Sequence, residues 1–373
     1  LKLDIFELLV QDENNLKTLQ IATEKVLGLS LWDKTFGLGL IHYNYRNINE
    51  DIFGKAYETF LAEERKEHGI FYTPTDITEY MSRLLVGRLF NQLKADLLTT
   101  LDQGEYKSAK DIIKRIINIK IADLSCGSGS FLVKVLKLIW QIYIEIHEKT
   151  AWATVKSELF EPDHIAKPKQ FVKEIRNEFG IGTDSFDARK AIALVILRHI
   201  FGADLDEKSI DVTKANIWKE AIKLSASSFR YTVLPESINH VLPDLELNFV
   251  VLNSIVDLPV NNSIEIIISN FKDDIIKLHQ IRNNYLRDPY DPELMAESKD
   301  IKKKIRQSLS EAFVENNSIA LPPSFLVLEF YFCFFDENGE VLSSTEKGFH
   351  GIIGNPPWEN IKPISKEYAA KYP

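Results

Sequence analysis

The chain has 373 residues, 45% of them hydrophobic and 27% charged, a composition that excludes a largely disordered protein and allows a sizeable core. No apolar run is long enough to span a bilayer, and we expect no signal peptide because Leu1-Lys2-Leu3-Asp4 lacks the basic start and apolar core of one. The net charge of −9 argues against a surface that holds nucleic acid along its whole length. Two cysteines alone form neither a disulfide framework nor a zinc site, so we expect a cytoplasmic protein without a metal centre.

Residues 1–68 are predicted to form a helical region, which Gly69 ends. The next segment, Phe71-Tyr72-Thr73-Pro74, is expected to be extended because Pro74 disfavours helix at Thr73. Thr75 or Asp76 can then cap a helix. The apolar face predicted for that helix consists of Ile77, Tyr80, Met81, Leu84 and Leu85.

From about residue 117 short apolar strands alternate with helices. The predicted strands are 119–124, 200–205 and 249–252, and the predicted helices are 131–146, 187–198 and 209–224. This alternation favours a doubly wound, mostly parallel α/β sheet.

Residues 264–316 break the alternation, because their apolar residues step at helical spacing on both sides of a turn at 288–292. We interpret them as a helical hairpin inserted between two strands. Its run Lys302-Lys303-Lys304 is expected to be a solvated helix face rather than a DNA contact. Strand character returns at 325–335 and at 351–354, around a turn at 336–339.

Three segments carry groups suited to binding and chemistry. In the first, Asp123-Leu124-Ser125-Cys126-Gly127-Ser128-Gly129, a strand ends in an acid and a glycine turn leads into a helix. Glycines at such a turn let backbone N–H groups approach a ligand at the helix N-terminus. In the second, Asp204 ends the next strand, where a carboxylate can accept hydrogen bonds from a ribose diol. Asp206 or Glu207 can cap the following helix, which leaves Asp204 for the ligand.

The third segment, Gly354-Asn355-Pro356-Pro357-Trp358, follows the last predicted strand. The prolines fix the backbone and have no N–H. The side-chain oxygen of Asn355 and the carbonyl of Pro356 can together accept both hydrogens of an amino group. Trp358 offers a flat face on which a base can stack.

Together these segments resemble the gamma class of S-adenosylmethionine-dependent DNA methyltransferases that act on adenine N6, as in type IIG fused restriction–modification enzymes. The resemblance covers roughly residues 55–360 and rests on the order of Phe71-Tyr72-Thr73-Pro74, the glycine turn, Asp204 and Asn355-Pro356-Pro357-Trp358. It implies the class I methyltransferase fold, with a catalytic domain at 69–373. The cofactor-binding residues that it implies are Tyr72, Thr73, Asp123, Ser125, Gly127, Gly129, Asp204, Leu205 and Asn253. The catalytic residues that it implies are Asn355, Pro356, Pro357 and Trp358, which would hold a flipped adenine.

The sequence departs from the family pattern at two positions. An acid is usual near the end of the third strand, where this chain has Asn253-Ser254, although an Asn oxygen can still accept the bond from the cofactor's adenine. An acid often precedes the last motif, where this chain has His350 after Phe349. We expect His350 to be a surface or packing residue.

The resemblance also implies partners. Double-stranded DNA is expected to be held mostly by a target-recognition domain outside this chain, which agrees with the acidic net charge, and a nuclease domain or subunit is a further expected partner. Two kinds of alternative remain open: a protein glutamine or RNA methyltransferase, and a scaffold with a vestigial cofactor pocket. Cytosine N4 is a second possible target for the same amino-group chemistry.

Overall fold

The computed structural model describes residues 73–160, 166–179, 188–225, 243–254, 259–287, 291–316 and 325–356. The predicted helical region 1–68 and the residues Tyr72, Pro357 and Trp358 lie outside these ranges. Among the described helices, none is both long and apolar enough to cross a membrane.

Four strands form one sheet in the described part of the chain: β1 (Ile121–Asp123), β2 (Ile200–Asp204), β3 (Phe249–Val251) and β4 (Gly351–Ile352). Their order is β3-β2-β1-β4, and every neighbouring pair is parallel. The chain therefore builds outward from β1 to β3 and then returns to place β4 on the other side of β1. The predicted doubly wound parallel fold is confirmed, and its crossover point lies between β1 and β4.

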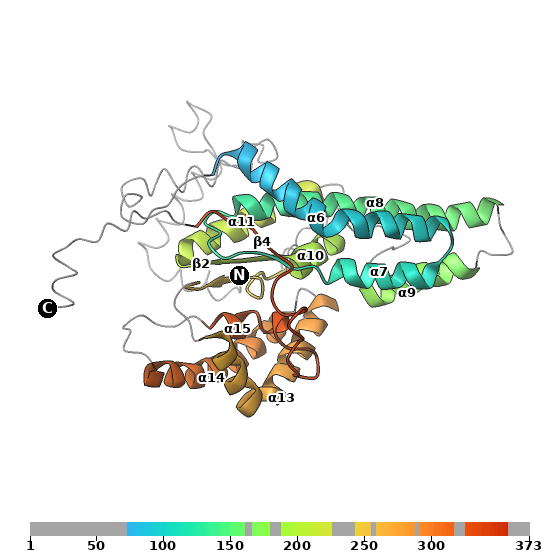
Figure 1. The fold of residues 1–373 in the computed structure, drawn as a ribbon. Helices are drawn as coiled ribbons and strands as arrows, with labels where there is room; N and C mark the ends of the chain where they lie inside the picture. Colours follow the sequence, from blue (N-terminus) through green and yellow to red (C-terminus); the bar gives the residue numbers. More distant parts are fainter. Residues whose placement is uncertain are drawn as a thin grey trace, which may run out of the picture. The chain divides into compact units, whose positions relative to one another are not determined.

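One face of the sheet is covered by the helices that precede β3, drawn from blue to yellow-green in Figure 1. They are α6 (Thr75–Asp102), α7 (Tyr106–Ile117), α8 (Ser130–Phe160), α9 (Ala166–Phe179), α10 (Ala188–His199) and α11 (Glu207–Leu224). Ile121, Ile200 and Phe249 bury their side chains in the hydrophobic cluster on this side. The burial of such side chains is worth roughly 1.5–3 kcal/mol each and fixes the helices to the sheet.

The opposite face is covered by α13 (Val260–Arg287), α14 (Pro292–Asn316), α15 (Leu326–Glu329) and the 3₁₀ helix η7 (Tyr331–Cys333), shown in orange and red in Figure 1. The hydrophobic cluster on this side includes Ala122, Phe201 and Val250. Each of them is adjacent in its strand to a residue whose side chain lies on the other face of the sheet. Because side chains alternate across a strand, both faces of the sheet are apolar and both are buried. The helical hairpin predicted at 264–316 is therefore the second layer of the fold.

The prediction of strand character for Phe325–Phe335 is wrong. Leu326–Glu329 is helical, Tyr331–Cys333 is a 3₁₀ turn, and every residue of Phe325–Phe335 except the partly buried Leu326 is buried. A continuous apolar run has no alternation to mark a strand, so its period cannot separate a buried strand from a buried helix. The predicted turn at 336–339 is confirmed, since Gly339 N donates to Asp336 O at 3.0 Å.

Two predictions about helix surfaces are also wrong in part. Helix α6 begins at Thr75 without a side-chain cap, and Ile77, Tyr80 and Leu84 on its predicted apolar face are exposed. The buried residues of α6 are instead Thr78, Ser82, Val86, Phe90, Leu97 and Leu101. Lys302 is buried rather than solvated, because its Nζ pairs with Glu329 Oε2 at 3.0 Å.

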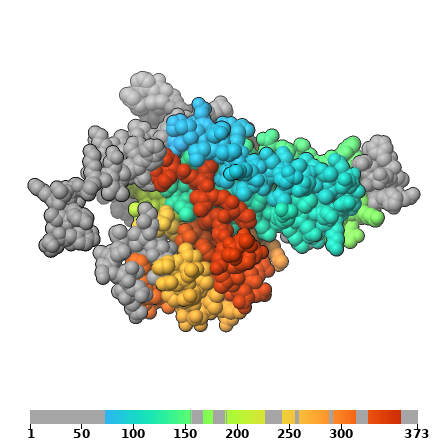
Figure 2. Space-filling model, in the orientation of Figure 1, coloured from blue at the N-terminus to red at the C-terminus, as the bar shows by residue number. Residues whose placement is uncertain are grey.

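Figure 2 shows that the last described segment, in red, lies on the surface between α6 and the second helical layer. This segment carries the chain from η7 back to β4. Backbone bonds hold it at both ends, since Gly348 N donates to Cys333 O at 2.7 Å and Ile353 N donates to Ala122 O at 2.9 Å. The residues that follow β4 are thereby fixed beside the end of β1.

Candidate active site at the carboxyl edge of the sheet

The ends of β1, β2 and β4 bring three of the predicted segments together at one edge of the sheet. Asp123 is the last residue of β1 and is 1% exposed. Its Oδ1 accepts from Ser125 N at 3.1 Å, so the carboxylate stabilises the turn that follows it. Gly354 approaches the same oxygen so closely that an added Cβ would lie 2.6 Å from it. Glycine is therefore required before Asn355, because a side chain there would displace Asp123.

Asp204 joins the ends of β1 and β2. Its Oδ2 accepts from Gly127 N at 2.8 Å, and its Oδ1 accepts from Asp206 N at 3.0 Å. The separate role predicted for Asp206 is confirmed, because its side chain caps α11 by accepting from Lys208 N at 3.1 Å. The Asp204 carboxylate is therefore not used to cap α11, and it bonds to the glycine turn at the open edge of the sheet. The next residue, Leu205, leaves 70% of its side chain exposed at this edge.

The glycine turn is held from behind by two residues of α11 that the sequence did not single out. Thr213 Oγ1 donates to Gly127 O at 2.7 Å, and Asn216 Nδ2 donates to Ser128 O at 2.8 Å. Gly129 has a φ of +80°, and a Cβ on it would lie 2.9 Å from Thr213 Cγ2. Gly127 has a φ of +52° with open space where its Cβ would be. The first glycine therefore faces an open volume, and the second allows the helix to pack against the turn.

The segment after β4 contacts the segment before α6. Asn355 Nδ2 donates to Thr73 Oγ1 at 3.0 Å, although the two residues are 282 positions apart. Since the amide nitrogen is committed to Thr73, Oδ1 has the acceptor role in any contact with a substrate. Asn355 and Thr73 are half-buried, and Pro356 is exposed.

Asn253 follows β3 and is half-buried. The loop that carries it is tied to the first segment, because Ser254 Oγ donates to Leu124 O at 2.5 Å. His350, by contrast, lies before β4, and its Nδ1 accepts from Lys120 N at 3.2 Å. The prediction that His350 is a surface or packing residue is confirmed. No group of three or more His, Cys, Asp or Glu side chains that could hold a metal occurs in the described ranges.

Asp123 and Asp204 share an electrostatic environment that disfavours negative charge. Burial raises the pKa of Asp123 from 3.8 to about 7, and the nearby Asp204 carboxylate adds to the shift, while the Ser125 N–H opposes it. Burial also raises the pKa of Asp204. A carboxyl group buried without a cation is an attractive partner for a positively charged ligand.

This environment makes stability depend on pH. The unfolded chain ionises Asp123 near 3.8 and the folded chain near 7, so the folded state holds the extra proton between these values. The free energy of unfolding is therefore expected to fall as the pH rises from about 4 to about 7, by up to roughly 4 kcal/mol. Asp123→Asn, which has no proton to lose, should remove most of that slope. Urea unfolding at pH 5, 6, 7 and 8 measures it, and equal slopes in both proteins would contradict the shift.

Comparison with known families supports the resemblance found in the motifs. Residues 48–155 match the N-6 DNA methylase family, and residues 198–373 match the Eco57I restriction-modification methylase family. No solved structure matches the chain significantly.

Curated relatives carry related names. The chain is similar to the type II restriction enzyme and methyltransferase RM.Eco57I of Escherichia coli, with 27% identity over 58% of this chain and 19% of that protein. It is also similar to DNA methyltransferase A of Bacillus subtilis, with 22% identity over 47% of this chain and 16% of that protein. A third relative is the type I restriction enzyme MpnII methylase subunit of Mycoplasma pneumoniae, with 29% identity over 33% of this chain and 18% of that subunit. In each case the matched region is less than a fifth of the relative's length.

The parallel sheet with helices on both faces is that of a class I methyltransferase fold. Within that class, the two family matches place residues 48–155 and 198–373 with the N6-adenine DNA methyltransferases of the restriction–modification type.

Proposed function

We propose that this chain is the catalytic domain of an enzyme that transfers a methyl group from S-adenosylmethionine to the N6 amino group of adenine in DNA. The observation that carries the proposal is the junction of Thr73, Asp123, Asp204 and Asn355 at one edge of the sheet. We assign the domain to residues 69–373, with 1–68 as a separate helical region.

The residues at the edge fit the parts of S-adenosylmethionine. A buried Asp123 whose pKa is raised to about 7 suits an ammonium group, which would return the carboxyl to its ionised form. The two oxygens of Asp204 each accept one backbone N–H and retain acceptor capacity for the hydroxyls of a ribose. Open space beside Gly127 and the exposed side chain of Leu205 leave room for a ligand with an apolar face.

We assign the remaining predicted residues by their position in the chain. Ser125 and Gly129 shape the turn that holds the amino acid part of the cofactor, and Asn253 accepts a hydrogen bond from its adenine. Tyr72 and Thr73 close over its methionine end. Bound S-adenosylmethionine supplies an electrophilic methyl group on a sulfonium centre.

The chemistry at the target requires no metal and no strong base. The amino nitrogen of adenine is a poor nucleophile because its lone pair is delocalised into the ring. Asn355 Oδ1 and the carbonyl of Pro356 would accept its two hydrogens, so that the lone pair becomes localised and points away from both acceptors. Alignment of this lone pair with the methyl group accelerates the transfer. The extra proton on the amino group leaves to solvent after the transfer.

Holding the base is the remaining task. Adenine N6 is inaccessible in a stacked duplex, so the target base must leave the helix. We assign Trp358 to stack on the extruded base and Pro357 to fix the turn that carries it. Such stacking is worth about 1–3 kcal/mol per base.

The rest of the protein is part of the proposal. The acidic net charge of this chain supports a separate target-recognition domain that contacts most of the DNA backbone. The names of the relatives support a restriction–modification role in the cytoplasm, in which a nuclease domain or subunit cleaves DNA that lacks the mark.

The proposal is tested by methyl transfer from labelled S-adenosylmethionine to a random duplex DNA library by the full-length protein. We expect label in N6-methyladenine after enzymatic digestion to nucleosides. Label in N4-methylcytosine, in RNA or in protein glutamine would assign one of the alternative substrates. Cofactor binding by calorimetry without transfer to any substrate would instead support the scaffold.

A further inference from the structure

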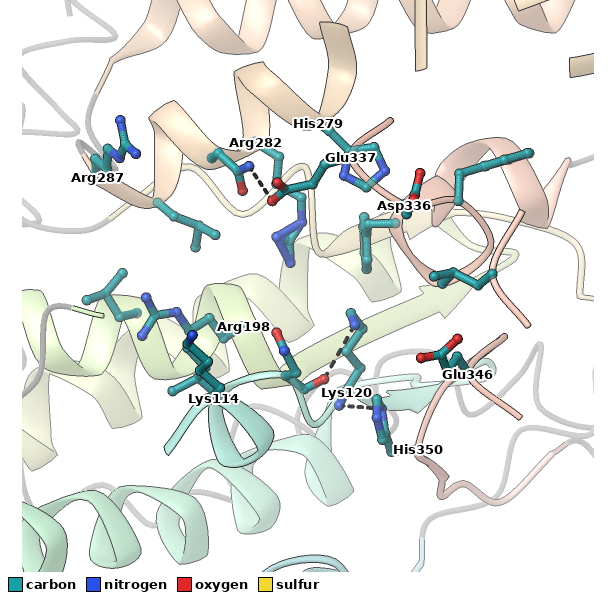
Figure 3. A pocket seen from close by; sticks show the side chains of 18 of the residues that line it. Lys114, Lys120, Arg198, His279, Arg282, Arg287, Asp336, Glu337, Glu346 and His350 are labelled. Atoms are coloured by element: carbon teal, nitrogen blue, oxygen red, sulfur yellow. Dashed lines mark hydrogen bonds between the residues drawn. The ribbon is translucent and has the colours of Figure 1, made fainter. Parts of the chain in front are cut away.

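A pocket opens at the amino edge of the sheet, the edge opposite to Asp123 and Asn355. Its volume is about 1060 Å³. Lys120 precedes β1, Arg198 lies in the last turn of α10, and Arg282 lies on α13, and all three line the pocket. Figure 3 shows that Lys120 and Arg282 extend into the same space from opposite walls. The candidate active site uses none of these residues.

Two of these cations have no ion pair in the described part of the chain. Lys120 Nζ contacts only the carbonyl of Asn118, at 3.4 Å. Arg282 Nη2 donates to Leu197 O at 3.1 Å, and its guanidinium lies 4.2 Å from the centre of the Phe332 ring. A guanidinium has five N–H donors, so capping the end of α10 through Leu197 uses a small part of its capacity.

The cations also repel one another. Burial lowers the pKa of Lys120, and the charge of Arg282 lowers it further. Burial lowers the pKa of Arg282 as well, and the charge of Arg198 adds to that effect. The nearby Cys333 does not offset these charges, because burial raises the pKa of its thiol to about 12 and keeps it neutral. Holding like charges together in this way costs free energy that an anion would return.

The acids in the pocket wall accept hydrogen bonds from neutral groups near them. Asp336 Oδ1 accepts from the N–H groups of its own turn, at 2.9 Å from Asn338 N. Glu337 Oε1 accepts from Asn283 Nδ2 at 2.8 Å. Glu346 accepts from Ser343 Oγ at 2.6 Å. In the described ranges none of these three acids forms an ion pair with Lys120 or Arg282, so both cations keep their donors for a ligand.

A histidine provides an independent indication of a ligand. His279 lines the pocket from α13 and is 7% exposed, yet its Nε2 has no hydrogen-bond partner. A buried polar atom without a partner costs about 1–3 kcal/mol. Burial lowers the pKa of His279 to about 4, and the ring donates to the backbone of Phe335, so Nε2 of the neutral ring is an acceptor that a hydroxyl group of a ligand can fill.

We propose that this pocket binds a small organic polyphosphate of the nucleoside triphosphate class. Lys120, Arg198 and Arg282 would contact the phosphates, since ammonium and guanidinium groups are the usual partners of phosphate oxygens, and His279 Nε2 would accept from a hydroxyl group of the sugar. The pocket is much larger than one phosphate needs, and Glu337 and Glu346 offer acceptors for the hydroxyl groups of a sugar. Duplex DNA at the candidate active site would occupy the opposite edge of the sheet, so the two ligands do not compete for one surface.

Calorimetric titration of the full-length protein with ATP, without magnesium, tests the proposal. We expect saturable binding that Lys120→Met weakens by about tenfold or more, as loss of a charge-assisted hydrogen bond implies. The matched control is Lys277→Met on α13, because Lys277 is exposed, pairs with Glu297 and does not line the pocket. It should leave ATP binding unchanged. Inorganic tripolyphosphate should compete with ATP for the pocket. If tripolyphosphate binds much more weakly than ATP, the pocket also recognises the nucleoside part of ATP.

Absence of ATP binding, or equal weakening by Lys120→Met and Lys277→Met, would overturn the proposal. Displacement of ATP by a short duplex that carries no target adenine would overturn it in favour of the DNA backbone. A measurement that needs no variant follows the ring resonances of His279, which should shift on addition of ATP. The affinity for S-adenosylmethionine should be the same in the wild type and in Lys120→Met. A failure of the proposed polyphosphate site can therefore be distinguished from a failure of the proposed methyltransferase site.

Discussion

Asn355→Ala is expected to reduce single-turnover methylation by about 100-fold or more, because it removes a preorganised acceptor that acts on the amino group in the transition state. Binding of S-adenosylmethionine should change little, since we assign Asn355 to the target amino group and the polar groups of the cofactor to Asp123 and Asp204. The measurement is rapid-quench methylation of a target duplex beside a calorimetric titration of the cofactor. Near wild-type turnover in the variant would mean that the reaction takes place elsewhere.

The orientation of the amide can be tested separately at Thr73. Thr73→Val keeps the shape of the side chain but removes the oxygen that accepts from Asn355 Nδ2. Without that bond the amide can present its nitrogen to the substrate, so turnover should fall, whereas Thr73→Ser, which keeps the hydroxyl, should retain most of it. Thermal melting of each variant shows whether the loss is one of chemistry or of folding.

Asp204→Ala is expected to weaken S-adenosylmethionine binding by about 10- to 100-fold, since hydrogen bonds to a charged acceptor are worth about 1.5–3 kcal/mol. The same carboxylate also accepts from Gly127 N, so part of the loss is expected to come from a looser glycine turn. Asp204→Asn keeps one oxygen for Gly127 and should therefore bind more tightly than Asp204→Ala. An unchanged dissociation constant in both variants would remove Asp204 from the site.

The matched control for this loss of charge is Asp300→Ala, because Asp300 is exposed on α14 in the second helical layer. It should bind the cofactor like wild type. Asp206→Ala provides a second comparison, since it removes the cap of α11 but leaves Asp204 in place. It should lower the melting temperature more than it changes cofactor affinity.

The positions of site residues could be predicted from the sequence where a strand ends in a polar residue. Asp123, Asp204 and Asn355 each follow a short apolar run, and parallel strands bring their carboxyl ends to one edge, so their proximity follows from the topology. The same reasoning distinguished Asp204 from the capping Asp206. These inferences need only local pattern and one rule about parallel sheets.

Other contacts depend on packing between distant segments, and no local sequence pattern predicts them. Thr213 and Asn216 are ordinary helix residues until α11 is placed behind the glycine turn. The bond between Asn355 and Thr73 depends on how α6 lies across the end of β4. The burial of Phe325–Phe335 as helical turns arises because a second apolar layer surrounds it, and no alternation in the segment records that.

The position of β4 has a consequence for how the protein folds. Lys120 and His350, which bond at the start of β1 and β4, are 230 residues apart, so this pairing closes the longest loop in the sheet. β4 itself has two residues and gains little from its own hydrogen bonds. The pairing of β4 with β1 is opposed by the entropy of closing this loop until α13, α14, α15 and η7 have packed on the sheet. Asn355 is therefore expected to reach Thr73 late in folding, after both helical layers have packed on the sheet.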